Sequence, residues 1–141
     1  MPAPQQRHVG RQRAIQALFS LEAATPDDLA QGLSRFWASM DERTSEGARA
    51  FAEELVRGVV ERRRELDDAI QAQSENWKVE RMARVDRNVL RLGALELLHT
   101  DTPGRVVIHE AVELAKTFGA EGSPAFVNGI LDKIAKAAGR V

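Results

Sequence analysis

The sequence predicts an all-α protein with six to seven helices arranged in two helical subdomains. Apolar residues recur every three to four positions along most of the 141 residues, which is the spacing of an amphipathic helix. The alternating pattern of a strand extends only over residues 105–108, which is too short for a sheet. Several prolines and glycines fall between the periodic segments, where helices begin and end; among them are Pro26, Gly104, Gly119 and Pro124. At this length we expect a single domain, residues 1–141.

The first part of the chain predicts an arm and two helices. Residues 1–6 contain two prolines and two glutamines and are expected to be disordered. A helix is predicted from Arg7 to about Ala24, with an apolar stripe that includes Ile15 and Leu18. Thr25 is then expected to cap a second helix whose first position is Pro26.

The rest of the chain predicts one long helix and three shorter ones. The long helix runs from about residue 45 to residue 74, and the next, at about residues 85–99, is apolar nearly all round and therefore central. Gly119 ends the following helix, and Ser123 with Pro124 begins the last. The two subdomains are expected at about residues 7–75 and 76–141. The expected core includes Leu18, Leu55, Val89, Leu97, Ala111, Val112, Ile130 and Ile134.

Composition and charge exclude several classes of protein. The chain has no cysteine, which excludes disulfides and cysteine-ligated metals. It shows neither a signal-peptide pattern nor an apolar run of about 18 residues, so we expect a cytoplasmic protein without a membrane span. The net charge of −1 argues against general coating of nucleic acid. Three arginines nevertheless precede Glu22, the first acidic residue, and indicate a local site for anions.

No constellation of residues points to catalysis. The three histidines have no metal-ligand spacing, and the glycines form no phosphate-binding loop. We therefore expect no enzymatic activity, no cofactor and no metal site.

The residues themselves suggest contacts with RNA. Arg7 and Arg11 lie four positions apart on one helix face, beside a helix N-terminus that favours phosphate. His8 can hydrogen-bond bases or sugars, and Phe126, at the edge of the predicted core, can stack on an unpaired base. The alternatives are that the arginines solubilise a fraying end and that Phe126 is a core-rim residue. A second basic run is interpreted as a solvated helix face with Glu80 and Asp86 as its partners; it consists of Arg81, Arg84, Arg87 and Arg91.

Several segments of the sequence resemble the NusB family of transcription antitermination factors. The resemblance is strongest in residues 85–134 and extends over nearly the whole chain. It is carried by Val89-Leu90-Arg91-Leu92, by Ile108-His109-Glu110-Ala111-Val112-Glu113-Leu114-Ala115-Lys116, by Phe118-Gly119 and by Phe126-Val127-Asn128-Gly129-Ile130-Leu131-Asp132. Ala14-Ile15-Gln16-Ala17-Leu18-Phe19 is similar to the first helix of the family.

The resemblance implies a function and a set of contact residues. It implies that the chain pairs with a small-subunit ribosomal protein, in the role called NusE. The pair would bind single-stranded boxA-type nascent RNA and help RNA polymerase pass terminators in ribosomal RNA operons. The RNA-binding residues implied are Arg7, His8, Arg11, Arg13, Phe126 and Asn128. The residues implied to face the protein partner are Phe19 and Asp86.

The sequence also departs from the family pattern and leaves alternatives open. Phe19 stands where tyrosine is common, His109 where asparagine is common, and Gly122 where an acidic residue is found. One alternative is the NusB-like domain fused to ribosomal RNA cytosine methyltransferases, although that enzyme needs a cysteine and a further domain. Another is a helical adaptor that binds protein only. A homodimer that covers the RNA surface is a third possibility within the family.

Overall fold

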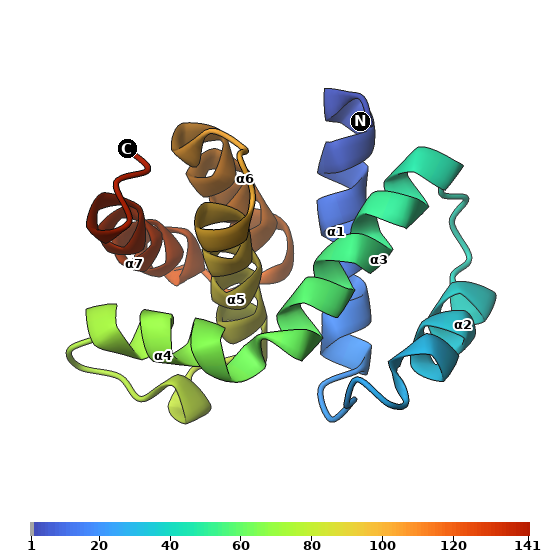
Figure 1. Cartoon of the computed structure of the whole chain (residues 1–141), viewed down its shortest axis with the longest axis horizontal. Helices are drawn as coiled ribbons and strands as arrows, with labels where there is room; N and C mark the ends of the chain where they lie inside the picture. Colours follow the sequence, from blue (N-terminus) through green and yellow to red (C-terminus); the bar gives the residue numbers. More distant parts are fainter. Residues whose placement is uncertain (1) are drawn as a thin grey trace. The chain divides into compact units, whose positions relative to one another are not determined.

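The computed structural model describes residues 2–141 and shows seven α-helices with one short 3-10 helix over that range (Figure 1). No strand occurs in the described residues, so the predicted all-α class is confirmed. The chain divides into two compact units, Met1–Glu61 and Arg62–Val141, which we call the N-terminal and C-terminal units. Each unit is described by itself.

The N-terminal unit consists of α1 (Pro4–Ser20), α2 (Leu29–Ser39) and α3 (Glu46–Glu61). Because α1 begins at Pro4, the predicted disordered arm is wrong for residues 4–6; residue 1 lies outside the described part. Proline suits the first turn of a helix, where its missing N–H donor costs nothing. The Gln6 Oε1 atom also accepts a hydrogen bond of 3.1 Å from the backbone N–H of Ala3, which satisfies a donor before the first turn.

Helices α1 and α3 pack side by side along much of their length (Figure 1). Gly10 permits the close approach, because a Cβ atom at this position would lie 2.8 Å from Cδ2 of Phe51. Further along the contact, Leu18 and Leu55 are 1% and 3% exposed, which confirms both as core residues.

The start of α2 differs from the predicted one. Thr25 does not cap the helix; its backbone N–H instead donates a hydrogen bond of 2.7 Å to Oδ1 of Asp28. Residues 26–28 form a turn, and the helix begins only at Leu29. Asp28, which would lie in the first turn of the predicted helix, therefore stabilises the turn that precedes the observed one.

The C-terminal unit contains α4 (Arg63–Gln73), the 3-10 helix η1 (Val79–Arg81), α5 (Arg84–His99), α6 (Gly104–Phe118) and α7 (Ser123–Ala137). The predicted long helix over residues 45–74 is thus two helices, α3 and α4, with a break at Arg62. The unit boundary falls at this break rather than at residue 75. Leu66 and Ile70 of α4 are fully buried and continue the apolar period, so the pattern does not reveal the break.

Helix α5 is the centre of the C-terminal unit, as its apolar circumference predicts. Every residue from Asn88 to Leu97 is buried. Arg91 is among them, and its Nε and Nη2 atoms donate to the two carboxylate oxygens of Asp67 on α4, at 2.7 and 2.9 Å. The prediction that Glu80 and Asp86 partner this basic run is therefore wrong for Arg91.

Helices α6 and α7 complete the unit. Val89, Leu97, Ala111, Ile130 and Ile134 are all buried, so these five core predictions are confirmed. Val112 was predicted in the core but is only half-buried. The buried face of α6 is made by Val107, Ala111, Leu114 and Ala115, so Ala111 belongs to it and Val112 does not.

We expect that Asp67→Ala destabilises the fold, because it leaves the Arg91 guanidinium buried without its carboxylate. Since the Asp67 side chain is itself 28% exposed, the loss should be about 3 kcal/mol, the lower end for a broken buried pair. The control is Asp68→Ala, which removes the neighbouring exposed carboxylate of α4. Urea denaturation of both variants would contradict the interpretation if the two midpoints shifted equally.

Candidate nucleic-acid interface

Four of the predicted RNA-binding residues lie on α1: Arg7, His8, Arg11 and Arg13. The first turn of this helix contains no acidic residue, so nothing there offsets the positive end of the helix dipole. The structure divides the four residues into two pairs with different environments.

Arg7 and His8 are half-buried and keep part of their surface in solvent. The Nη1 atom of Arg7 donates a hydrogen bond to the backbone carbonyl of Pro2. This contact folds the side chain back along the start of α1, so that its charge stays beside the helix N-terminus. Arg7 and His8 therefore keep the partial exposure and the position near the helix N-terminus on which their predicted contact with RNA depends.

Arg11 and Arg13 are buried, at 2% and 7% exposure. The guanidinium carbon of Arg11 lies 5.3 Å from the centroid of the Phe51 ring on α3, within the range of a cation–π contact. Arg11 and Arg13 were both predicted to contact RNA, and that role stays a prediction. Their charges face protein groups rather than solvent.

Arg13 connects α1 to the segment that precedes α3. Its Nε atom donates to Oγ1 of Thr44 at 2.9 Å, and its Nη1 atom donates to Oε1 of Gln16 at 3.0 Å. The Nη2 atom lies 3.5 Å from Oε2 of Glu42. These three partners make Arg13 a structural residue of the N-terminal unit.

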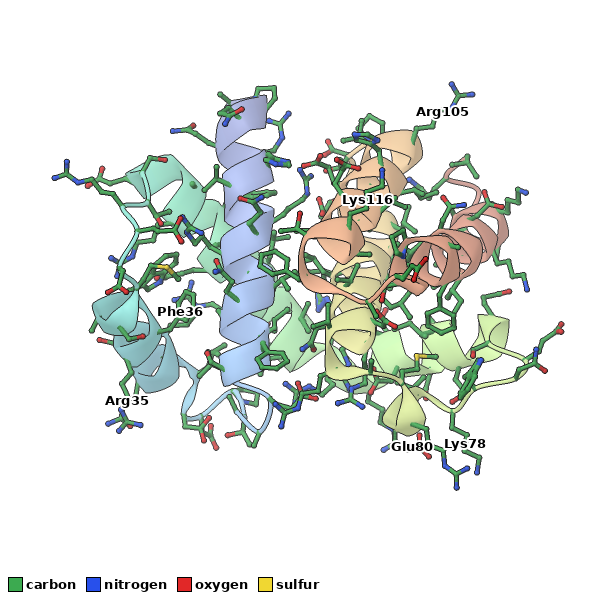
Figure 2. All side chains as sticks on the ribbon, turned by 180° about the vertical axis from the view of Figure 1, so that it is seen from behind. Arg35, Phe36, Lys78, Glu80, Arg105 and Lys116 are labelled. Atoms are coloured by element: carbon green, nitrogen blue, oxygen red, sulfur yellow. The ribbon has the colours of Figure 1, made fainter. Side chains whose placement is uncertain are left out.

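Phe126 and Asn128, the two RNA candidates on α7, face different hollows. A helix turns by about 100° per residue, so side chains two positions apart point in nearly opposite directions. Asn128 lines a groove of about 530 Å³ between α6 and α7. The other residues of the groove are Arg105, Ile108, His109, Val112, Asp132, Lys136 and Val141. Figure 2 shows Arg105 extending from its ribbon into solvent.

Phe126 lines a second, smaller hollow of about 220 Å³, which we call the aromatic hollow. Its lining residues are Trp77, Arg81, Met82, Ala83, Asp86 and Phe126. The hollow unites a residue predicted to contact RNA, Phe126, with a residue predicted to contact protein, Asp86. The Oδ1 atom of Asp86 is buried and has no hydrogen-bond partner among the residues that the structure describes.

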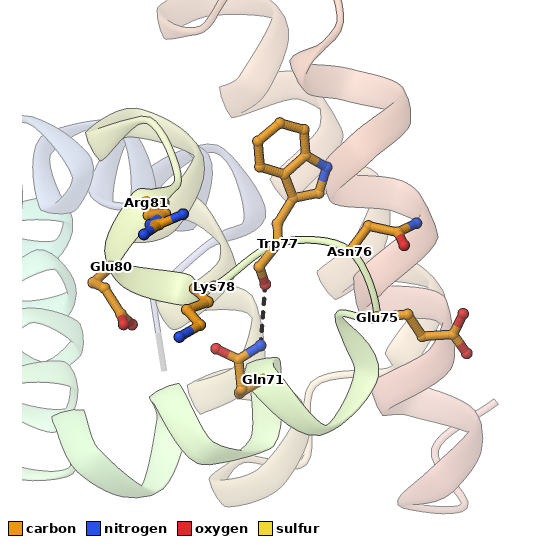
Figure 3. A pocket seen from close by; sticks show the side chains of 7 residues that line it. All are labelled: Gln71, Glu75, Asn76, Trp77, Lys78, Glu80 and Arg81. Atoms are coloured by element: carbon orange, nitrogen blue, oxygen red, sulfur yellow. Dashed lines mark hydrogen bonds between the residues drawn. The ribbon is translucent and has the colours of Figure 1, made fainter.

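Sequence reasoning missed Trp77 as a candidate contact residue. Its side chain is 58% exposed, and Figure 3 shows the ring extending away from Gln71, which donates a hydrogen bond of 3.0 Å to the Trp77 carbonyl. The available signal was a large aromatic residue within the polar run Ser74-Glu75-Asn76-Trp77-Lys78. An exposed tryptophan in such a run is a candidate contact residue.

The two predicted partner-binding residues fall in different units. Phe19 lies near the end of α1 and is 45% exposed, an unusual degree for a large aromatic side chain. Asp86 lies in the first turn of α5 and is half-buried. Their role as contacts of one protein partner stays a prediction.

The described residues offer neither a cluster of metal ligands nor a helix fit to span a membrane. No group of three or more His, Cys, Asp or Glu side chains within residues 2–141 is arranged to hold a metal ion. In the same part of the chain, every helix is too short or too polar to cross a bilayer.

The fold and the cationic start of α1 define a small, all-helical protein with the features of a nucleic-acid-binding factor. The model of the NusB family matches residues 8–136, and the chain belongs to this family. Similar proteins named transcription antitermination protein NusB occur in Anaeromyxobacter dehalogenans and Myxococcus xanthus. The first is 54% identical over 89% of this chain and 87% of its own length, and the second is 50% identical over 93% and 95%.

Solved structures agree with this assignment. NusB of T. maritima is 38% identical and superposes with a TM-score of 0.77 over 96% of this chain and 93% of its own. A chain in the crystal structure of antitermination factors NusB and NusE in complex with dsRNA is 28% identical, with a TM-score of 0.79 over 96% and 99%. The resemblance inferred from the sequence is confirmed.

Because Arg13 is buried among three partners, Arg13→Ala should lower the free energy of unfolding. The expected loss is about 1.5–3 kcal/mol, the range for hydrogen bonds made by a charged group. The matched control is Arg35→Ala, since Arg35 extends from α2 into solvent (Figure 2). Thermal and urea unfolding should separate the two variants; equal stability would contradict the structural role of Arg13.

Proposed function

We propose that this chain is a transcription antitermination factor that binds boxA-type nascent RNA together with a small-subunit ribosomal protein of the NusE kind. In this role it acts with RNA polymerase on ribosomal RNA operons, which places it in the cytoplasm. The observation that carries the proposal is the match to the NusB family over residues 8–136.

The comparisons support both halves of the proposed function. The curated relatives carry the name transcription antitermination protein, and the solved complex contains NusB, NusE and RNA. NusB is not a family of enzymes, so the chemistry to explain is recognition. Because the relatives from A. dehalogenans and M. xanthus match over 87% and 95% of their own lengths, we favour a NusB factor over the methyltransferase-fused domain.

We infer that RNA meets the N-terminal unit at the start of α1. Arg7 supplies a partly exposed cation, and His8 supplies a ring that can donate or accept a hydrogen bond. The N-terminus of α1 adds backbone N–H groups and a positive dipole, which together favour a phosphate. In the C-terminal unit, Asn128 offers its amide to a base or sugar, and Arg105 supplies a cation to the same groove, where Lys136 is paired with Asp132 at 2.9 Å.

The protein partner is proposed to contact Phe19 and Asp86. Exposed aromatic side chains often dominate the binding energy of an interface, because they bury a large apolar area at little cost in conformational entropy. The remaining alternatives are the protein-only adaptor and the homodimer. The adaptor would bind the protein partner but no RNA, and the homodimer would cover the surface that binds RNA.

Arg7→Ala should weaken RNA binding at all salt concentrations, because it removes a phosphate contact. For a single strand, losing one contact should lower the slope of log K against log salt by about 0.7. Affinity is measured for the complex with the ribosomal protein at several salt concentrations, using boxA-type RNA as a single strand and as a duplex. Arg35→Ala serves as the control for the loss of one positive charge. An unchanged slope for Arg7→Ala would remove the start of α1 from the RNA site.

Phe19→Ala should weaken binding of the ribosomal protein by about 2 kcal/mol, the loss typical of an aromatic hot spot. Isothermal titration calorimetry without RNA measures this directly. The control is Val106→Ala, which trims another exposed apolar side chain, on α6. If the partner bound normally but no RNA bound to the complex, the protein-only adaptor would replace the proposed function.

A further inference from the structure

The groove between α6 and α7 combines an aliphatic floor with an arginine that has no partner in the described residues. Helix α6 contributes Ile108 and Val112 to the floor, and the C-terminal segment contributes Val141. We propose that this α6–α7 groove docks one amphipathic helical segment of another protein in the transcription complex, with an acidic side chain of that segment paired with Arg105. This inference rests on the proposed function, because it adds a second protein contact to the antitermination complex.

The floor of the α6–α7 groove is an apolar surface that stays open to solvent. Val141 is 55% exposed, and Ile108 and Val112 are half-buried. Apolar side chains that are gathered in one place and rimmed by polar residues are typical of an interaction site. A partner that covered them would gain the free energy of removing their surface from water.

The end of the groove at Val141 is held in place by Arg140. The guanidinium of Arg140 donates hydrogen bonds to the backbone carbonyls of Leu97 and Thr102. Gly104 permits this close packing, because a Cβ atom at its position would collide with the carbonyl oxygen of Arg140. The groove is therefore formed before a partner binds, which lowers the entropic cost of docking.

The length of the groove suits about two turns of a docking helix. Arg105 and Val112 lie seven positions apart on α6, which corresponds to a rise of about 10 Å. Residues i and i+7 of a docked helix are separated by the same distance, and apolar anchors at i, i+3 or i+4, and i+7 are the usual pattern for a helix bound in a groove.

Arg105 determines the charge of the occupant. Its side chain extends into solvent (Figure 2) and makes no hydrogen bond or ion pair within the described residues. Lys136 lines the same groove but is paired with Asp132 on α7 at 2.9 Å. An incoming carboxylate therefore meets one available guanidinium, which can bind it through two parallel hydrogen bonds.

The lining of the groove favours protein over RNA. Among the lining residues that the structure describes, His109 alone has a ring, whereas unpaired bases are usually stacked on aromatic side chains. One available guanidinium beside the Asp132 carboxylate also offers little attraction to a chain of phosphates. In this proposal Asn128 contacts protein, so the experiment must separate a protein occupant from RNA.

A photo-crosslinking amino acid at the rim of the groove identifies the occupant. Benzoylphenylalanine is introduced in place of His109, which is exposed and lines the groove. The control position is Lys133, which is exposed on α7 but does not line the groove. Both chains are assembled with the ribosomal protein and RNA polymerase on a transcript that carries a boxA-type sequence. Irradiation should link position 109, but not position 133, to one helical segment of a protein other than the ribosomal protein.

Exchange of charges tests the pairing with Arg105. Arg105→Glu should raise the concentration of the chain needed for half-maximal terminator readthrough roughly tenfold, which corresponds to about 1.4 kcal/mol. Lysine in place of the acidic residue of the linked segment should restore readthrough by Arg105→Glu and impair readthrough by the wild-type chain, since both changes act on one interaction. Lys133→Glu is the matched control, because it reverses an exposed charge outside the groove.

Substitutions in the aliphatic floor test the apolar part of the proposal. Ile108→Ser and Val141→Ser should each lower both the crosslinking yield from position 109 and terminator readthrough, because the docked segment loses an apolar contact. Affinity for the ribosomal protein and for RNA should stay unchanged in both variants. Circular dichroism establishes that each variant is folded, and Val141→Ser is the less disruptive of the two because Val141 is largely exposed.

The outcomes distinguish failure of the inference from failure of the proposed function. If the wild-type chain binds neither RNA nor the ribosomal protein, the proposed function itself fails. If it binds both, but Arg105→Glu and Val141→Ser leave readthrough unchanged, only the docking groove is overturned. Crosslinks from position 109 to RNA, with weaker RNA binding by Arg105→Glu, would make the groove an RNA contact. Crosslinks to the ribosomal protein or to a second copy of this chain would also overturn the proposal.

Discussion

The C-terminal unit depends on the need to cover α5 on every side. Ten consecutive residues of this helix are buried, so α4, α6 and α7 must each contribute an apolar face to it. Arg91 adds a directional constraint, because its guanidinium satisfies both carboxylate oxygens of Asp67 only in one placement of α4. Gly93 adds a steric one, because a Cβ atom there would lie 2.6 Å from Cδ1 of Leu131 on α7. The candidate surfaces of this unit are formed by the residues that take no part in these contacts.

Helix α7 shows how packing separates functions along one element. Val127 and Leu131 face the core, whereas Phe126 and Asn128 emerge on opposite flanks. One flank joins Asp86 and Trp77, and the other joins the groove lined by Arg105 and by the ion pair of Lys136 with Asp132. A single helix therefore presents two surfaces of different chemistry, one aromatic and acidic and the other polar with mixed charges.

The arginines of α1 differ in how far their side chains are buried. Arg11 and Arg13 are equivalent to Arg7 in chemistry but are held by Phe51 and Thr44 within the N-terminal unit. Their positive charge still contributes to the potential near the start of α1, although their donors are directed inward. Arg7, nearer the helix end, keeps partly exposed surface.

The sequence by itself determined the helical class, most of the core and the family, because helical period and local motifs are properties of neighbouring residues. The tertiary structure decided what depends on distant residues. The break at Arg62 is invisible to a period that continues through Leu66, and the inward direction of Arg11 requires Phe51, 40 positions away along the chain. Likewise, Trp77, Asp86 and Phe126 become one hollow only when η1, α5 and α7 pack. A periodic pattern specifies which face of a helix is buried, but the identity of its neighbours is fixed only by packing.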